Sequence, residues 1–309
     1  MAVFRIAHVS DLHVLSPRGF EWRQALFNKR LTGYANLLFR RGRVYRRAYL
    51  SAVLEGAAAW AEHVVVTGDV TNLSLEPEFE HARALLDDLA RRVEVTVVPG
   101  NHDAYLPSVQ SQRRFRHHLG AFLHGDLPEL ARDLDAGPFP CVKLRGPVAI
   151  IALSSAVPRP PFVSSGRVGE AQLAALGEIL AHPEVARRTP VILVHHPPVD
   201  DRIRLRVLRD GLVDGERLRV TLAPLTHGLV LFGHLHVRAR RALRTARGTL
   251  DAIGATAAAL DHPDPRARAG FNAYTFDDEG RCTGFDARVV EPDGRTLRTV
   301  PLPERPEEA

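Results

Sequence analysis

Aspartate, asparagine and histidine residues that could bind metal ions or move protons recur at five separate places in the 309-residue chain. Each place directly follows a short apolar run. Together the side chains offer imidazole nitrogens with carboxylate and amide oxygens, a mixture that suits Zn, Mn or Fe and not an all-oxygen calcium site. The five blocks are Ser10-Asp11-Leu12-His13, Gly68-Asp69, Gly100-Asn101-His102-Asp103, His195-His196-Pro197 and Gly233-His234-Leu235-His236.

The five blocks contain more donor atoms than one tetrahedral ion needs, so two ions that share a carboxylate are the simplest arrangement. Gly68, Gly100 and Gly233 are typical of backbone turns that pack tightly against such a centre. The sequence therefore predicts a site for two divalent or mixed-valence ions (Mn, Zn or Fe), whose identity depends on pocket shape and metal supply.

The apolar runs before the blocks have the length and the Val and Ile content of buried strands. Segments with helical spacing lie between many of them, which predicts a layered α/β fold. Ligands of open α/β sheets bind beyond the carboxyl ends of the strands, so five such ends predict one convergent site. We predict strands at Phe4–Val9, His63–Val66, Val93–Val98, Val148–Leu153, Val191–Val194 and Leu229–Phe232, and helices at Tyr45–Trp60, Pro77–Arg91 and Glu170–Ala181.

The last part of the chain has a different pattern. Three strand-like runs are joined by turns that contain Asp and Gly, which is typical of antiparallel hairpins. We predict a single domain over residues 1–300 that ends in β-hairpins at 271–300, followed by a disordered Pro- and Glu-rich tail at 301–309. Packing of the hairpins on their own domain and pairing across a dimer both fit the pattern. The runs are Phe271–Phe276, Gly284–Glu291 and Arg295–Val300.

The composition is that of an ordinary globular protein, with 45% hydrophobic and 25% charged residues and a net charge of +5. Two cysteines, Cys141 and Cys282, are too few for a disulfide framework. The N-terminus lacks the zones of a signal peptide, and no apolar run reaches the length of a membrane span. We therefore expect a cytoplasmic protein.

The ordered set Asp-x-His, Gly-Asp, Gly-Asn-His-Asp, a strand-end His and Gly-His-x-His resembles the calcineurin-like metallophosphoesterases over residues 4–236. The resemblance implies a four-layer αββα sandwich of two mixed sheets flanked by helices. Carried over by position, it implies that Asp69 bridges the two ions. The first ion would be held by Asp11, His13 and His236, and the second by Asn101, His195 and His234.

The resemblance also implies the reaction, which is hydrolysis of a phosphate ester by in-line attack of a hydroxide that bridges the two ions. His102 would protonate the leaving alkoxide, with Asp103 as its orienting partner. His195 is preferred to His196 as the ligand because the family uses the first position of a His-x-Pro pattern. His196 could instead face the phosphate or pack, and Asn72 could line the pocket or form a turn.

The Gly-Asn-His-Asp and Gly-His-x-His blocks look more like bacterial cyclic-nucleotide phosphodiesterases than like protein phosphatases. The latter carry Gly-Asp-x-Val-Asp-Arg-Gly and Gly-Asn-His-Glu, whereas this chain has Gly68-Asp69-Val70-Thr71-Asn72. A cyclic-nucleotide type of phosphodiesterase is therefore the leading hypothesis. A non-catalytic scaffold of the same fold is the alternative from another class, but such relatives lose ligands and this chain has the full set.

A basic segment at residues 17–47 separates His13 from the first predicted helix. It contains one acid, Glu21, and a helically spaced apolar face, which fits either a lid or contact with an anionic membrane. Its charge alone does not indicate a specific nucleic-acid partner. The membrane interpretation gives a second hypothesis, a peripheral membrane pyrophosphatase that cleaves a nucleotide-lipid such as UDP-diacylglucosamine. The basic residues are Arg18, Arg23, Lys29, Arg30, Arg40, Arg41, Arg43, Arg46 and Arg47.

Overall fold

The computed structural model describes residues 3–14, 44–199 and 204–305 and contains two six-stranded mixed sheets. The first sheet has the order β14-β13-β12-β1-β2-β3, with β1, β2 and β3 parallel and β12 antiparallel to β1. Its strands are β1 (Phe4–Val9), β2 (His63–Val66), β3 (Glu94–Val97), β12 (Gly270–Phe276), β13 (Cys282–Val290) and β14 (Leu297–Pro301).

The second sheet has the order β10-β11-β9-β8-β7-β6, in which β7, β8, β9 and β11 are parallel and the two edge strands are antiparallel to their neighbours. A separate small hairpin is formed by β4 (Arg132–Leu134) and β5 (Gly137–Phe139). The strands of the second sheet are β6 (Cys141–Arg145), β7 (Val148–Ala152), β8 (Thr189–Leu193), β9 (Leu229–Phe232), β10 (Ala239–Arg244) and β11 (Thr249–Gly254).

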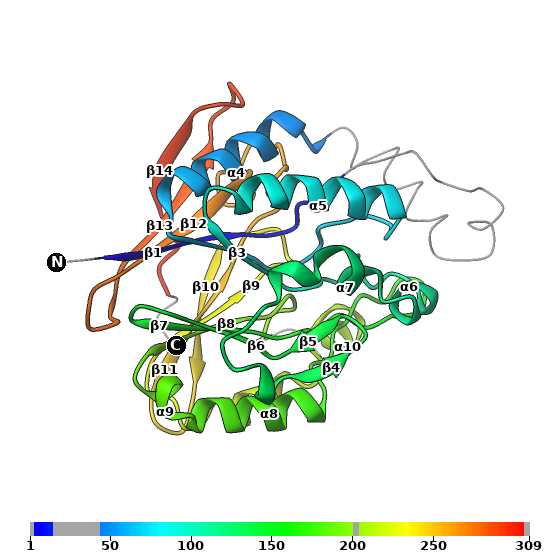
Figure 1. Cartoon of the computed structure of the whole chain (residues 1–309). Helices are drawn as coiled ribbons and strands as arrows, with labels where there is room; N and C mark the ends of the chain where they lie inside the picture. The colour runs from blue at the N-terminus through cyan, green and yellow to red at the C-terminus, as the bar shows by residue number, and fades with distance from the viewer. Residues whose placement is uncertain (1–2, 15–43, 200–203, 306–309) are drawn as a thin grey trace.

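Helices cover the outer faces of both sheets, so that the layers follow the order helix, sheet, sheet, helix (Figure 1). Helices α4 (Arg47–Trp60) and α5 (Glu76–Ala90) cover the first sheet, and α8 (Glu170–Ala181) lies against the second. This arrangement confirms the predicted αββα sandwich. The shorter helices are α6 (Pro107–Ser111), α7 (Arg114–Leu119), α9 (Pro183–Ala186), α10 (Arg204–Asp210) and α11 (Gly215–Thr221), with 3-10 turns at Gly120–Phe122 and Pro128–Leu130.

The near-continuous apolar strands follow from burial on both faces. In β7, Ile150 belongs to the core between the two sheets, whereas Ile151 belongs to the core beneath α8. Successive side chains of a strand point to opposite faces, so a strand covered on both sides needs apolar residues at every position. All five residues of β7 are buried.

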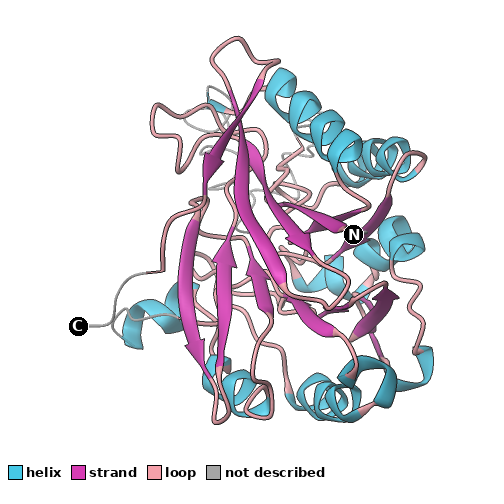
Figure 2. Ribbon diagram, turned by 90° about the vertical axis from the view of Figure 1, so that its left-hand side faces the viewer, coloured by secondary structure: helices cyan, strands magenta, loops and turns pink. Residues whose placement is uncertain are grey.

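The C-terminal hairpins extend the first sheet, because β12 pairs with β1 from Phe4↔Phe276 to His8↔Asn272. Figure 2 shows the long strands of this region side by side. The predicted start of the disordered tail, residue 301, is too early in the chain. Pro301 still belongs to β14, and Leu302 is buried. Arg305 also lies 2.7 Å from Asp251, and an ion pair with a partly buried carboxylate holds it in place.

Most of the basic segment 17–47 lies outside the described residues, so the lid and membrane interpretations of residues 17–43 stay predictions. Its last residues are described, and Arg47 begins α4. None of the helices that the structure describes is long and apolar enough to cross a membrane.

An ion network centred on Glu94 links the two sheets at the end opposite the strand-end loops of β1. Glu94 lies on β3 of the first sheet, and its carboxylate is 2.6 Å from Arg145 Nε and 3.3 Å from Lys143 Nζ on β6 of the second. His63, whose Nδ1 lies 3.5 Å from the Glu94 carboxylate, and then Arg145 hold the pKa of Glu94 well below its usual range.

We expect Glu94→Gln to lower the free energy of unfolding by about 1 kcal/mol at neutral pH. The loss is small because water screens a partly exposed ion pair. A depressed folded-state pKa gives stability that is present above the ordinary carboxyl pKa and declines as the pH falls below it. The difference between the wild-type and variant proteins should therefore shrink in acid. Melting temperatures of both proteins at neutral and acidic pH check this, and a constant difference would contradict it.

Candidate metal centre

The seven predicted metal ligands all lie in loops that follow parallel strands of the two sheets. The first sheet contributes the loops after β1, β2 and β3, and the second contributes those after β8 and β9. The carboxyl ends of these strands meet in one region, which is where open α/β sheets bind ligands. In order along the chain the residues are Asp11, His13, Asp69, Asn101, His195, His234 and His236.

Asp11, His13 and His236 form one compact group, whose potential ligand atoms all lie within 4.8 Å of one another. His236 Nε2 is 3.0 Å from Asp11 Oδ1 and 3.2 Å from His13 Nε2. The aspartate and His13 are buried, and His236 is partly buried. These are the three residues predicted for the first ion.

A second group forms around the amide oxygen of Asn101. Asn101 Oδ1 lies 2.9 Å from His234 Nδ1 and 3.2 Å from His195 Nε2. Asp69 joins the two groups, because its Oδ2 is 3.4 Å from His195 Nε2 and 4.0 Å from His13 Nε2. The structure thus places the predicted bridging carboxylate between the two sets of ligand atoms, and metal binding by these residues stays a prediction.

The hydrogen bonds on the outer side of the cluster decide which histidine atoms face inward with a lone pair. In three of the rings, the nitrogen that points away from the centre contacts a backbone carbonyl. A carbonyl oxygen only accepts, so this nitrogen carries the hydrogen and a neutral ring has its lone pair on the other nitrogen. The contacts are His13 Nδ1 with Thr71 O, His195 Nδ1 with Thr67 O and His234 Nε2 with Asp210 O.

The centre therefore gathers acceptors: imidazole lone pairs, carboxylate oxygens and an amide oxygen. Acceptors repel one another at about 3 Å unless a cation or a proton lies between them, and outward hydrogen bonds from metal-binding histidines are the usual means of fixing the ring. The donor set mixes nitrogen and oxygen, as Zn, Mn and Fe sites do. The residues present fit the two ions that the sequence predicts.

The electrostatics of the buried residues also favour positive charge at this centre. Burial alone would lower the pKa of His195, but the Asp69 carboxylate outweighs burial and raises it to about 9. A proton on His195 would thus supply the positive charge between these acceptors, and a metal ion would take the place of that proton. Burial would likewise raise the pKa of Asp69, but the positive charge of His195 holds it well below its usual value. The carboxylate is therefore ionised, which is the state that a metal ligand needs.

The backbone of the ligand loops is strained. Five of the seven predicted ligands have a positive φ, a conformation that non-glycine residues rarely adopt. Such conformations persist where the surrounding structure imposes them, and they concentrate at functional sites. The φ values are 50° for Asp11, 45° for His13, 50° for Asp69, 67° for His234 and 53° for His236.

Gly100 permits the close approach of the Asn101 loop to Asp69. A Cβ at position 100 would lie 2.1 Å from Asp69 Oδ1 and 2.4 Å from Asp69 N. We expect Gly100→Ala to displace the carboxylate and lower metal content and turnover by at least about tenfold, the scale on which disturbing the surroundings of a metal ligand acts. Metal analysis of the purified variant checks this.

The matched control for that substitution is Gly177→Ala. A Cβ there meets nothing within 4 Å, and the residue lies within α8. This change should keep full activity and stabilise the helix by up to about 1 kcal/mol. Full metal content in Gly100→Ala would show that the close approach is not needed.

Asp11 is held by a buried relay of side chains that sequence analysis did not identify. Ser10 Oγ donates to Asp11 Oδ2 at 2.6 Å, and Thr67 Oγ1 donates to Ser10 Oγ at 2.8 Å. His8 Nε2 then contacts Thr67 Oγ1 at 2.8 Å, and burial lowers the pKa of His8 to about 3. His8 is therefore neutral and structural, as its lack of a motif suggested.

The relay depends on β1 and β2 lying side by side in the parallel register that pairs His8 with Val65.

Tyr45 is a further residue near the centre without a sequence signal. Its hydroxyl lies 3.4 Å from His236 Nδ1, and its ring packs edge-on against the His13 ring. Adjacency to Asp11 and Asp69 was the available hint for Ser10 and Thr67. For Tyr45 there was none.

The structure gives His102 an orienting partner other than the predicted Asp103. His102 Nδ1 lies within hydrogen-bonding distance of the backbone carbonyl of Asn72, so this carbonyl orients the ring. Asp103, predicted as the orienting residue, instead accepts hydrogen bonds from the backbone amides of Gly100 and Thr71 and from the Thr71 hydroxyl. Its carboxylate is bound within the loop, and it ties the blocks after β2 and β3 together.

Of the two alternatives for Asn72, the structure favours a turn residue over a pocket-lining one, because the side chain is buried and its amide donates to the carbonyls of His13 and Val14. It therefore holds the His13 loop.

Burial, followed by the charge of Asp69, raises the pKa of Asp103 to about 7. A buried carboxyl group bound by several amides is typical of a structural tie.

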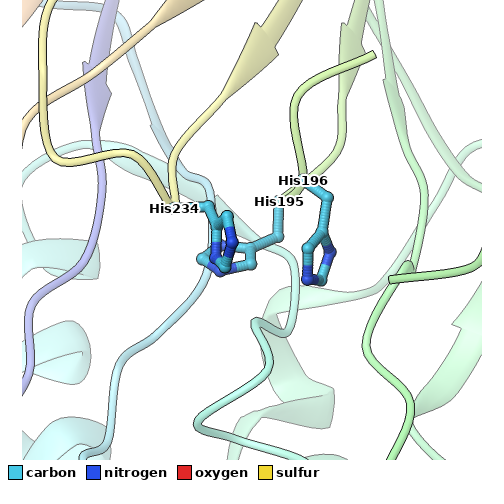
Figure 3. Close-up of side chains that lie close together, drawn as sticks. All are labelled: His195, His196 and His234. Atoms are coloured by element: carbon cyan, nitrogen blue, oxygen red, sulfur yellow. The ribbon is translucent and has the colours of Figure 1, made fainter. Parts of the chain in front are cut away.

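For His196, the structure favours packing over a contact with the phosphate. Its ring lies next to those of His195 and His234, as Figure 3 shows. However, its Nδ1 is 2.8 Å from Ser155 Oγ and its Nε2 is 2.8 Å from the Ser164 carbonyl. Both ring nitrogens have protein partners, so His196 packs behind the centre and is not a substrate contact.

Two mixed sheets that direct carboxylate, amide and imidazole groups to one centre define a metallohydrolase. The chain belongs to the calcineurin-like phosphoesterase family, whose sequence profile matches residues 4–238. It is therefore a metal-dependent hydrolase of phosphoric esters. The match includes all seven predicted ligands and confirms the family resemblance seen in the five sequence blocks.

Solved structures show the same fold at low sequence identity. A dimetal phosphatase from Danio rerio is 13% identical with a TM-score of 0.52, and the alignment covers 97% of this chain and 99% of that one. A purple acid phosphatase from yellow lupin (Lupinus luteus) seeds is 10% identical with a TM-score of 0.57, covering 96% of this chain and 53% of that one. A search of curated proteins found no match.

Proposed function

We propose that this chain is a two-metal phosphodiesterase with cyclic nucleotides as its substrate class. The observation that carries the proposal is the pair of inward-facing donor groups joined by Asp69 Oδ2, with His102 beside them. When bound, two divalent ions supply an activated water and neutralise charge on the phosphoryl oxygens. The motif style of the Gly-Asn-His-Asp and Gly-His-x-His blocks supports the cyclic-nucleotide type.

The residues of the chain then have separate tasks. Asp11 and Asp69, both ionised and buried, hold the charge of the centre, and the carbonyl contacts of His13, His195 and His234 fix their rings. The contact of His102 Nδ1 with the Asn72 carbonyl puts a hydrogen on Nδ1. A proton on Nε2 is then the one available for a leaving alkoxide, which is the role of a general acid.

A panel of substrates tests the proposal on the purified chain with added Mn. We expect hydrolysis of bis-p-nitrophenyl phosphate and of 3′,5′-cyclic AMP, and much slower hydrolysis of the monoester p-nitrophenyl phosphate. Equal or faster turnover of the monoester would contradict diester specificity. A fully metallated protein without turnover of any of the three would revive the scaffold hypothesis.

One observation favours a second candidate, the nucleotide-lipid pyrophosphatase. A largely apolar cavity of about 80 Å³ adjoins His13, with Leu12, Leu50 and Leu85 among its lining residues. Arg46 and Arg47 also line it, so an apolar group and a phosphate could both be accommodated there. Release of UMP from UDP-diacylglucosamine, without cyclic AMP turnover, would select this candidate.

A further inference from the structure

Exposed apolar side chains lie in the loop 159–167, in the helices α10 and α11, and in the turn that joins these two helices. We call the set the Phe162 surface. Outside it, the described residues include one other exposed large hydrophobic side chain, Val3 at 50%. The members of the Phe162 surface and their exposed fractions are Phe162 83%, Leu205 74%, Val220 60%, Leu208 50% and Val213 37%.

The loop and α10 form one unit through their backbones. Ser164 N donates to Arg209 O, Gly166 N donates to Gly211 O, and Val213 N donates to Gly166 O. None of the side chains of α10 is buried, so this helix presents its leucines to the surroundings and not to the core. An isolated helix of this length is unstable in water, so the loop contacts are needed to hold it.

The backbone at Phe162 has a φ of 67°, which a bulky aromatic residue rarely adopts. This conformation does not place the Phe162 side chain in the core, because 83% of its surface is exposed. Strain that is kept while an aromatic ring stays in solvent indicates a binding role for the ring.

Positive charge surrounds these apolar groups. Arg159 and Arg167 line the hollow beside Val163 and Leu208, and the Arg159 Nη2 atom is buried without a hydrogen-bond partner. Arg204 and Arg206 lie exposed on α10, and neither has an ion-pair partner among the described residues.

The acids that the structure describes in this region are already engaged. Asp210 pairs with Arg209, and Glu216 pairs with Arg219. The carboxylate of Asp214 accepts hydrogen bonds from the backbone amides of residues 168 and 169. Among the described residues of the Phe162 surface, the unpaired charge is therefore positive.

We propose that the Phe162 surface docks on an anionic lipid bilayer. Exposed Phe and Leu side chains flanked by arginines match an interface in which apolar groups enter the acyl region and guanidinium groups contact phosphates. A second copy of the chain is a poorer partner, because self-association would bring the arginines of two copies together. The residues of this surface are not those of the basic segment 17–47.

Docking there would bring the metal centre close to lipid. The Ser164 carbonyl in the loop contacts His196, and the Asp210 carbonyl at the end of α10 contacts the candidate ligand His234. Figure 1 shows α10 at the end of the molecule toward which β1 runs from the N-terminus. The inference does not rest on cyclic-nucleotide specificity and holds for any phosphate ester substrate.

Co-sedimentation of the full chain with vesicles tests the inference. We expect binding to vesicles that contain phosphatidylglycerol, weak binding to pure phosphatidylcholine, and weakening by salt. Phe162→Asp combined with Leu205→Asp should lower the partition coefficient by at least about tenfold, because two apolar side chains no longer enter the bilayer. Arg204→Glu with Arg206→Glu should weaken binding to the anionic vesicles alone.

The matched control is Val3→Asp, which changes the remaining exposed hydrophobic residue, next to β1, and should bind vesicles as the wild type does. Hydrolysis of bis-p-nitrophenyl phosphate by each variant reports whether the fold and centre are intact. Vesicle binding that survives in both double variants, or that is lacking in the wild type, overturns the inference. So does a wild-type dimer that these substitutions dissociate, since the surface would then bind protein.

Discussion

Asp69→Asn should remove both metal ions and lower turnover by about 10³-fold or more, because each 1.4 kcal/mol lost in stabilising charge corresponds to about tenfold in rate. The substitution keeps the shape of the side chain and removes its charge. Asp69 Oδ2 faces both His195 and His13, so its charge acts on both groups of candidate ligands. Metal analysis and steady-state kinetics on the same preparation measure the two effects.

Asp278→Asn serves as the control for this change. Asp278 is an exposed carboxylate in the turn between β12 and β13, and it should keep its metal and its activity when neutralised. A metal content of two ions per chain in Asp69→Asn would remove Asp69 from the bridging role. Full loss of folding, seen by circular dichroism, would instead require the milder Asp69→Glu, for which we expect partial metal occupancy.

His102→Ala should lower turnover by about 10²–10⁴-fold for substrates with alkoxide leaving groups, the range of general acid catalysis, while both ions stay bound. Metal binding should survive because the contact of residue 102 with Asp69 Oδ1 comes from its backbone amide, which alanine keeps. The imidazole that is lost lies between the edge of the His13 ring and the face of the Tyr105 ring.

The leaving group separates this role from a structural one. A p-nitrophenolate leaves without a proton, so bis-p-nitrophenyl phosphate should be affected far less than cyclic AMP. Tyr105→Phe keeps the stacking surface and should retain turnover of both substrates. Equal losses on both substrates, or loss of metal from His102→Ala, would show that His102 supports the centre and does not donate a proton.

The sequence was sufficient to predict the layers, most strand boundaries and the convergence of the seven candidate ligands, because each depends on a local pattern. A buried strand followed by a polar block, such as His63–Val66 before Asp69, contains its own signal. The strand-end rule then brings distant blocks together without knowledge of side-chain contacts. The family profile confirms the family, and the two solved structures show the same fold, whereas metal binding by the seven residues stays a prediction.

The sequence was not sufficient to predict contacts in which the partner is a backbone atom or in which two strands pair in a particular register. A carbonyl has no sequence signature, so the orienting group of His102 was assigned to Asp103 and proved to be the main chain of Asn72. The relay from His8 through Thr67 to Ser10 depends on the register of β1 and β2. The prediction for the C-terminal tail was wrong for a similar reason. Arg305 forms an ion pair with Asp251, which is distant in the sequence.

The pairing of β1 with β12 has a consequence for the order in which the protein matures. All seven candidate ligands are synthesised before residue 270, yet β1, which precedes Asp11 and His13, has an unpaired edge until β12 emerges from the ribosome. Unpaired strand edges recruit other chains, and contacts between the two ends of a sequence form slowly. Nascent chains that stall after the ligands are made should therefore depend on chaperones, and complete incorporation of metal should follow termination of translation.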